Sequence, residues 1–150
     1  MKRIMFVCHG NICRSPMAEF VLLEMIKKQR LDDKITVASS ATSTEEIGND
    51  IHHGTRRILD KYGIPYRHRE ATQLIRADYA KYDLFVGMDS YNVRNMHRIF
   101  GADPDGKIVK LLDFTDRPGD VADPWYTGDF ETTYRDVTEG CRALIDKIKP

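Results

Sequence analysis

The sequence predicts a single α/β domain in which a doubly wound, four-stranded parallel sheet carries helices on both faces. Short apolar stretches rich in β-forming residues alternate with stretches of helical periodicity, which favours a parallel sheet covered on both sides. The 150 residues are one domain's worth of chain, and no linker, repeat or low-complexity tract divides residues 1–150. With 41% hydrophobic and 31% charged residues, the composition is that of a globular protein.

The first predicted strand and helix frame the first candidate site. Residues 2–8 form a short apolar run that ends at a polar loop, as a buried strand does. Ser15 and Pro16 then open a helix, because Ser is a good N-cap and Pro needs no hydrogen bond at the first helical position. Ligands in this fold class bind beyond the carboxyl ends of the strands, so the loop between these two elements is the first place to look.

The later elements continue the alternation. Strands are expected over 35–39, 82–88 and 108–112, and helices over 51–62, 90–100 and 131–149. Cys141 falls on the apolar face of the last helix and is expected to pack there. Residues 113–130 form a long irregular segment, and loops of that length in a compact domain usually carry function.

Charge and cysteine usage exclude several classes of function. The 23 basic and 23 acidic residues balance, so we expect no bulk attraction to nucleic acid or to an anionic membrane. The apolar runs are too short to span a bilayer, and the first residues lack the pattern of a signal peptide. These features predict a cytoplasmic protein but leave open secretion without a signal peptide. Three cysteines are too few for a disulfide framework.

The loop after the first strand reads Cys8-His9-Gly10-Asn11-Ile12-Cys13-Arg14-Ser15. No proline interrupts it, so every backbone N–H is free to turn inward and bind an anion, helped by the positive end of the following helix. Gly10 and Asn11 tolerate the left-handed backbone that such a tight turn requires. Arg14 adds a planar fork of donors that suits two phosphate oxygens at once. The pattern predicts a phosphate-binding loop.

Cys8 lies at the start of this predicted loop. Donors that bind an oxyanion also stabilise a thiolate, so we expect Cys8 to be a nucleophile and Ser15 to donate a hydrogen bond to its sulfur. Two other interpretations remain: Cys8 is a packed thiol at a strand end, or Cys8, His9 and Cys13 bind a metal together with the histidines at 52 and 53. Their spacing matches no zinc pattern, and we expect neither a metal nor a cofactor.

A nucleophilic mechanism needs a second group that gives and takes a proton. In the long segment before the last helix, residues 123–126 (Asp-Pro-Trp-Tyr) place a carboxyl beside aromatic walls, and a phosphate dianion next to it would favour the protonated form. Asp116 and Asp120 in the same segment are alternatives, and an Asp-Pro pair is also a common surface turn. The adjacent aromatic side chains favour Asp123.

Together these stretches resemble the two motifs of the low-molecular-weight protein tyrosine phosphatases. Residues 7–16 are similar to the signature loop of that family and residues 123–126 to its general-acid motif, in the family's order along the chain. The resemblance covers essentially the whole chain. It implies hydrolysis of phosphotyrosine through a phosphocysteine intermediate, with Cys8 as nucleophile, Arg14 as phosphate clamp and Asp123 as acid and then base.

The resemblance also implies supporting residues. Asn11 would be bonded to Ser39 and His68, although a strand-end serine and a surface histidine are the plain alternatives. The crevice for a phenyl ring would be lined by Glu45, Glu46, Trp125 and Tyr126, and the phosphate loop would comprise His9, Gly10, Asn11, Ile12, Cys13 and Ser15. For Cys13 the resemblance implies a reversible, protective disulfide with Cys8; the alternative is a small side chain that fills the underside of the loop.

Two other functions compete with this one. The thioredoxin-coupled arsenate reductases resemble this chain in predicted fold and in the loop after the first strand. The further cysteine pair that their reaction needs is absent from residues 81–92. A phosphotyrosine-binding module without turnover is expected to lack the nucleophile or the acid, and both motifs are intact. The expected partners are therefore phosphotyrosine-containing proteins, with phosphate or other oxyanions as product or inhibitors.

Overall fold

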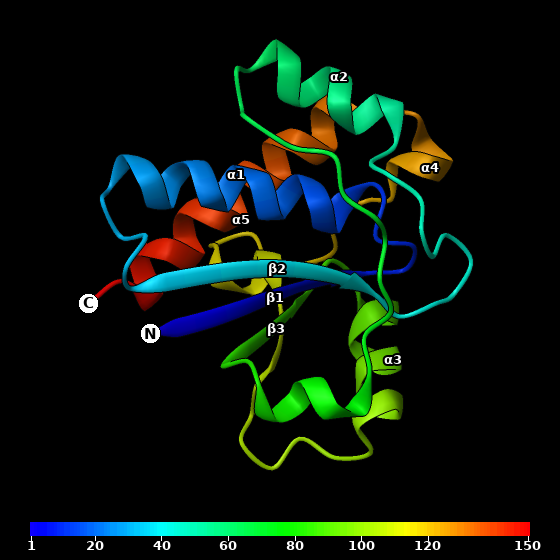
Figure 1. Cartoon of the computed structure of the whole chain (residues 1–150), viewed down its shortest axis with the longest axis vertical. Helices are drawn as coiled ribbons and strands as arrows, with labels where there is room; N and C mark the ends of the chain where they lie inside the picture. The colour runs from blue at the N-terminus through cyan, green and yellow to red at the C-terminus, as the bar shows by residue number, and fades with distance from the viewer.

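The computed structural model describes residues 1–150 and contains one four-stranded sheet with the strand order β2-β1-β3-β4 (Figure 1). Its strands are β1 (Lys2–Cys8), β2 (Ile35–Ala41), β3 (Leu84–Gly87) and β4 (Ile108–Lys110). Every neighbouring pair is parallel, and β1 lies in the centre between β2 and β3. The predicted fold class is confirmed.

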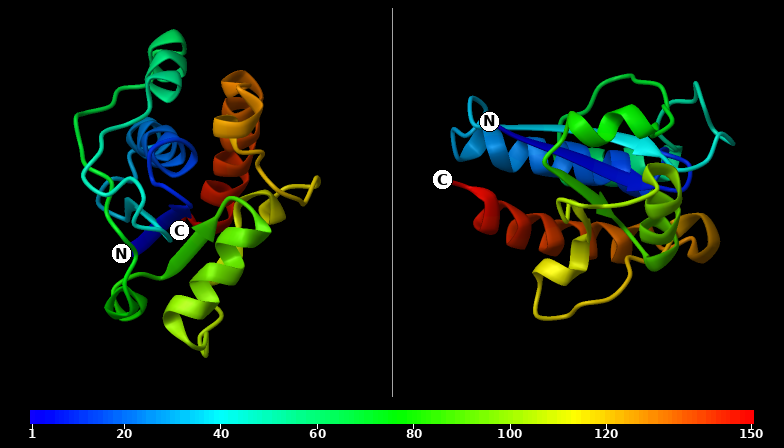
Figure 2. Two further views of the ribbon diagram at one scale, coloured as in Figure 1. Left: turned by 90° about the vertical axis from the view of Figure 1, so that its right-hand side faces the viewer. Right: turned by 90° about the horizontal axis from the view of Figure 1, so that it is seen from below.

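Helices cover both faces of the sheet. α1 (Arg14–Lys28) and α5 (Phe130–Ile148) pack on one face, and α3 (Ser90–Phe100) packs on the other (Figure 2). α2 (His53–Lys61) and the short α4 (Pro124–Thr127) lie near each other, beyond the start of α1 (Figure 1). Two 3-10 turns, η1 (Arg76–Ala80) and η2 (Leu111–Phe114), complete the fold. None of the helices combines the length and apolar character that a membrane span requires.

Alternate residues of β1 point into two separate cores. Ile4 and Phe6 pack with α1 and α5, whereas Met5 and Val7 pack with α3 on the opposite face. Because both faces are covered, the strand is apolar along its inner length and its last five residues are buried. Cys8 belongs to the same series as Ile4 and Phe6, which directs its side chain toward α1.

Two boundaries near the candidate loop differ from the predicted ones. α1 begins two residues earlier than expected, so Ser15 lies inside its first turn instead of capping it. The reason is that the Ser15 hydroxyl is engaged by the preceding loop and by the Cys8 sulfur. β2 extends past Ser39 to Ala41, because Ala41 pairs with Cys8 at the end of β1.

The long segment before the last helix is less irregular than the sequence indicates. The strand expected over 108–112 ends at Lys110 and continues as η2, and α4 forms directly after Asp123. Asp123 caps α4, because its carboxylate accepts a hydrogen bond from Trp125 N–H and Pro124 occupies the first turn. The remaining boundaries lie within two residues of the predicted ones.

Candidate active site

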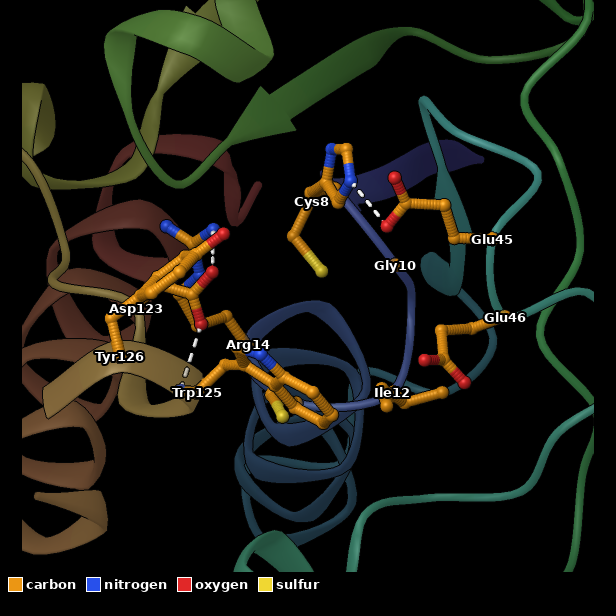
Figure 3. Close-up of a pocket in the computed structure, with 11 residues that line it drawn as sticks. Cys8, Gly10, Ile12, Arg14, Glu45, Glu46, Asp123, Trp125 and Tyr126 are labelled. Carbon is orange, nitrogen blue, oxygen red and sulfur yellow. Dashed lines mark hydrogen bonds and ion pairs between the residues drawn. The ribbon is translucent and has the colours of Figure 1, made fainter. Parts of the chain in front are cut away.

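The loop between β1 and α1 borders a pocket at the carboxyl end of the sheet (Figure 3). Asn11 turns the loop with a left-handed backbone, φ 59°, a conformation that Asn adopts more readily than most residues. The pocket has a volume of about 110 Å³. It is lined by Cys8, His9, Gly10, Ile12, Cys13, Arg14, Glu45, Glu46, Asp123, Trp125 and Tyr126. The structure thus brings the three predicted catalytic residues and the four predicted crevice residues together.

The carbonyl groups of the loop are bonded to the chain around it. Cys8 accepts from Thr42 N–H (3.0 Å), His9 from Ser43 N–H (3.1 Å), Asn11 from the Arg69 guanidinium, Ile12 from His52 N–H (2.9 Å) and Cys13 from the Thr55 hydroxyl (3.2 Å). In a planar trans peptide, the N–H of the next residue points opposite to the carbonyl. The N–H groups of residues 9, 10, 12, 13 and 14 are therefore directed away from these partners and into the loop. This arrangement agrees with the predicted phosphate-binding loop, and anion binding itself stays a prediction.

Two groups of Ser15 hold the Cys8 sulfur. Ser15 N–H donates to Cys8 Sγ at 3.4 Å, and Ser15 Oγ lies 3.0 Å from the same sulfur. Cys8 is 3% exposed, and Figure 3 shows its sulfur pointing into the pocket between the two walls. The sulfur is therefore almost entirely buried and faces the pocket.

A chain of hydrogen bonds sets the direction of the Ser15 hydroxyl. Asn11 Oδ1 accepts from a backbone N–H at 3.2 Å, which orients the amide so that Nδ2 faces Ser15 Oγ (2.8 Å) and Ser39 Oγ (2.9 Å). Because Asn11 donates to both serines, each hydroxyl keeps its own proton for another acceptor. Ser39 donates to Glu19 Oε1 at 2.7 Å, so Ser15 is left to donate to Cys8 Sγ.

Arg14 is held in place before any ligand binds. Its Nη1 donates to Asp89 Oδ2 (2.7 Å) and to the Val121 carbonyl (2.9 Å), and its Nη2 donates to Asp123 Oδ2 (3.3 Å). Burial alone would lower the pKa of Arg14, but its electrostatic interaction with Cys8 and the hydrogen bond to Asp89 raise it above its usual value. The guanidinium therefore stays charged beside the pocket.

Asp123 is the one candidate acid that lines the pocket; Asp116 and Asp120 do not. Asp120 instead accepts hydrogen bonds from Lys110 Nζ (2.9 Å) and from Ser90 N–H (3.2 Å), outside the pocket. Burial raises the pKa of Asp120, but these hydrogen bonds outweigh that effect and lower it below its usual range. Asp120 is therefore an ionised anchor for the segment, and the geometry favours Asp123 as the acid.

Two walls border the pocket above the loop (Figure 3). α4 supplies Trp125 and Tyr126, which are 58% and 83% exposed. The segment after β2 supplies Glu45 and Glu46 on the opposite side. His9 Nε2 lies 3.0 Å from Glu45 Oε2 and so connects the loop to that wall. One wall is therefore aromatic and the other is acidic.

Comparison with known proteins identifies the family. The family model described as low molecular weight phosphotyrosine protein phosphatase matches residues 3–150. The chain belongs to this family. It is 36% identical over 151 residues to YfkJ of Bacillus subtilis, across 99% of this chain and 97% of that protein. It is 39% identical over 149 residues to PtpA of Staphylococcus epidermidis, across 99% and 94%. Both relatives are named low molecular weight protein-tyrosine-phosphatases.

Solved structures agree with this assignment. The crystal structure of YfkJ from Bacillus subtilis matches with a TM-score of 0.95 at 36% identity, over 100% of this chain and 98% of that one. The low molecular weight protein tyrosine phosphatase SP-PTP from Streptococcus pyogenes matches with a TM-score of 0.91 at 42% identity, over 100% and 95%. The resemblance of the two motifs to this family is confirmed.

His68 does not join the Asn11 network of this phosphatase, contrary to expectation. Its Nδ1 lies 2.8 Å from Asp50 Oδ2, and 76% of its side chain is exposed. The next residue, Arg69, reaches the loop instead and donates to the Asn11 carbonyl. Ser39, in contrast, occupies the expected place beside Asn11. The sequence does not distinguish Arg69 from the charged residues on either side of it, so only the backbone path selects it.

The network also contains two carboxylates that the sequence analysis missed. Glu19 on α1 is 6% exposed and accepts from Ser39; burial raises its pKa above the usual value in spite of that hydrogen bond. Asp89 lies two residues after the end of β3, caps α3 and holds Arg14. Their positions in the sequence could have predicted both as site residues. Glu19 lies one helical turn after Ser15, and Asp89 lies at the carboxyl end of a strand next to β1.

Cys13 is a free thiol that is 5% exposed at the start of α1. Burial, together with the electrostatic interaction with Cys8, raises the pKa of Cys13 to about 12, so the side chain is a protonated thiol at neutral pH. A disulfide between Cys13 and Cys8 stays a prediction. No group of three or more His, Cys, Asp or Glu side chains is placed to hold a metal ion.

Proposed function

We propose that this chain removes phosphate from phosphotyrosine in proteins through a phosphocysteine intermediate. The observation that carries the proposal is the convergence of Cys8, Arg14 and Asp123 on one pocket. They come from the end of β1, the start of α1 and the start of α4. Membership of the phosphatase family supports the same reaction.

The loop binds the phosphate group first. The non-bridging oxygens accept hydrogen bonds from the inward N–H groups and from the Arg14 guanidinium, which together balance the charge of the dianion. Arg14 is already fixed by Asp89 and by the Val121 carbonyl, so little reorganisation accompanies binding. The phosphorus then lies above the Cys8 sulfur at the floor of the pocket.

In the first step, the Cys8 thiolate forms a bond to phosphorus and the bond from phosphorus to the tyrosine oxygen breaks. Asp123 gives its proton to that oxygen, so tyrosine leaves as a neutral phenol. The bound dianion beside Asp123 favours the protonated carboxyl before the step. The second step reverses these roles: Asp123 takes a proton from water, the water oxygen attacks phosphorus, and the bond from sulfur to phosphorus breaks.

Ser15 assists at the moment when the thiolate leaves. Its hydroxyl is oriented toward Cys8 Sγ by the Asn11 hydrogen bonds, so it stabilises negative charge that returns to the sulfur. Inorganic phosphate is the product and, like other oxyanions, inhibits by occupying the same loop. We further propose cytoplasmic phosphotyrosine-containing proteins as the substrates, because the aromatic wall is exposed at the surface and suits an aryl phosphate.

Replacement of the nucleophile tests the proposal. Cys8→Ser should abolish hydrolysis of p-nitrophenyl phosphate and of a phosphotyrosine peptide, because a serine hydroxyl is not ionised at neutral pH. Inorganic phosphate should still bind, as calorimetry would show, since the N–H groups and Arg14 remain. The same variant should retain phosphotyrosine proteins from a lysate. Appreciable turnover by Cys8→Ser would refute the phosphocysteine mechanism.

The two competing functions give different results in the same assays. A thioredoxin-coupled arsenate reductase needs further reactive thiols, but Cys141 is fully buried and burial raises its pKa. Arsenate reduction with thioredoxin should therefore be absent. A silent binding module would bind a phosphotyrosine peptide without releasing phosphate, and turnover of p-nitrophenyl phosphate excludes it.

A further inference from the structure

The start of α2 packs against the segment that carries the acid (Figure 1). His52, directly before α2, stacks on the ring of Phe130 with centroids 5.3 Å apart and meets the ring of Trp125 edge-on at 5.7 Å. Gly54 leaves the space that Phe130 fills, because a Cβ at this position would overlap the Phe130 ring. His52 thus packs against the aromatic wall of the pocket through Trp125.

His52 is also joined to the phosphate loop. Its backbone N–H donates to the Ile12 carbonyl at 2.9 Å, which is one of the hydrogen bonds that direct the loop amides inward. A single residue therefore contacts the loop through its backbone and the aromatic wall through its side chain.

The ring of His52 is held in one orientation. Its Nδ1 accepts from Gly54 N–H at 3.0 Å and so caps α2. An accepting Nδ1 carries no proton, so the neutral ring has its proton on Nε2. Burial lowers the pKa of His52 and the neighbouring His53 lowers it further, which keeps the ring neutral at pH 7.

We propose that His52 is a positioning residue that holds Trp125 beside the pocket and thereby sets the affinity for the aryl group of the substrate. Its ring does not line the pocket, and it acts through Trp125. The inference rests on the proposed function, because the wall matters only when an aryl phosphate enters the pocket.

Protonation of His52 opposes this arrangement. With a proton on Nδ1, the ring would face the Gly54 N–H as a second donor, and the cap of α2 would be lost. The titratable and charged groups around the ring are His53, Arg56 and Arg57 on α2 and Glu46 from the acidic wall. The groups that face it from α4, α5 and the loop are Trp125, Phe130 and the Ile12 carbonyl, all uncharged.

The tryptophan fluorescence of the protein comes from Trp125 alone, because it is the only tryptophan of the chain, so its emission spectrum reports the surroundings of that side chain. The experiment compares His52→Asn, which keeps a capping oxygen but removes the ring, with His52→Phe, which keeps a ring but removes the cap acceptor. His53→Asn is the matched control, since His53 stacks on His52 at 4.2 Å and not on Trp125. Trp125 emission and the dissociation constants of phenylphosphonate and inorganic phosphate are measured for each, and none of these readouts needs turnover.

In His52→Asn, the emission of Trp125 should move to longer wavelength as the indole meets more water. Phenylphosphonate should bind about two- to tenfold more weakly, the range expected for loss of an aromatic pair. Inorganic phosphate should bind as in the wild type, and His52→Phe should restore most of the aryl affinity. Unchanged emission and an unchanged ratio of the two dissociation constants in His52→Asn would overturn the proposal, as would an equal effect of His53→Asn.

The wild-type protein gives an answer even where His52→Asn does not fold. Burial and His53 lower the pKa of His52, so on acidification below the usual histidine range the wild-type emission of Trp125 should change as His52 takes a proton, and the change should be missing from His52→Phe. The same titration in His52→Phe as in the wild type would overturn the proposal. Loss of turnover with these binding results intact would count against the proposed reaction and not against the role of His52.

Discussion

Replacement of Asp123 by Asn tests the proton-transfer step most directly. In the wild type, Trp125 N–H donates to Asp123 Oδ1 at 3.1 Å. The side-chain oxygen of Asn can accept the same hydrogen bond, so α4 stays capped in the variant. Arg14 also keeps its hydrogen bonds to Asp89 and to the Val121 carbonyl. The change therefore removes an ionisable proton at one edge of the pocket, together with the negative charge that faces Arg14 Nη2 at 3.3 Å.

The size of the effect follows from the two oxygens that share the proton. A tyrosine hydroxyl is a much weaker acid than a carboxyl, so transfer of the proton to the departing oxygen becomes favourable as the bond from that oxygen to phosphorus breaks. General acid catalysis of this kind contributes about 10²–10⁴-fold, which corresponds to about 3–5 kcal/mol. We expect a loss in this range for phenyl phosphate in Asp123→Asn. The loss should be much smaller for p-nitrophenyl phosphate, whose departing oxygen is a weaker base.

Pre-steady-state kinetics with both substrates separate the two steps. The first step should show the leaving-group-dependent loss, and hydrolysis of the phosphocysteine should slow with either substrate, because Asp123 also activates the water. Asp116→Asn and Asp120→Asn are the matched controls, since neither residue lines the pocket. A leaving-group-dependent loss in Asp120→Asn or Asp116→Asn, but not in Asp123→Asn, would show that the acid is misassigned.

Three further predictions concern the groups around the nucleophile. Arg14→Lys should lower kcat by about 10²–10³-fold in steady-state assays, because one ammonium cannot replace a planar fork; near-normal kinetics would contradict the clamp. Peroxide should inactivate the wild type reversibly, and Cys13→Ser should recover less activity with a thiol reductant; equal recovery would remove Cys13 from a protective role. Burial raises the pKa of Glu19 in the folded chain. A carboxyl of this kind stabilises the fold below its unfolded pKa, and it loses that contribution as pH rises through its folded pKa. The Tm of Glu19→Gln relative to the wild type should therefore increase above about pH 4.5. A relative Tm that falls over that range would contradict the burial of an unfavourable charge at Glu19.

The sequence predicted those features that local chemistry determines. The loop from Cys8 to Arg14 and the segment 123–126 each consist of neighbouring residues, so residue type and spacing along the chain were enough to single them out as candidate sites. The fold class followed equally well, because continuous apolar strands that alternate with helices leave few other arrangements.

The sequence did not predict contacts that depend on how distant segments meet. Glu19 supports Asn11 only because β2 brings Ser39 between them, and Arg69 rather than His68 reaches the loop because of the path that the backbone takes after α2. Side-chain reach across such distances has no local signature. A resemblance in residue type at position 68 therefore indicated the right region and the wrong side chain.

The partners of Arg14 make phosphate a ligand of the folded chain alone. They lie 75, 107 and 109 residues further along the chain, at Asp89, Val121 and Asp123, so an unfolded polypeptide contains no equivalent binding site. A ligand that binds only the native state stabilises it by about 2.7 kcal/mol at 100 times its dissociation constant. The product of the reaction should accordingly raise the thermal stability of the enzyme while it inhibits turnover, so that heat inactivation is slowest where phosphate is abundant.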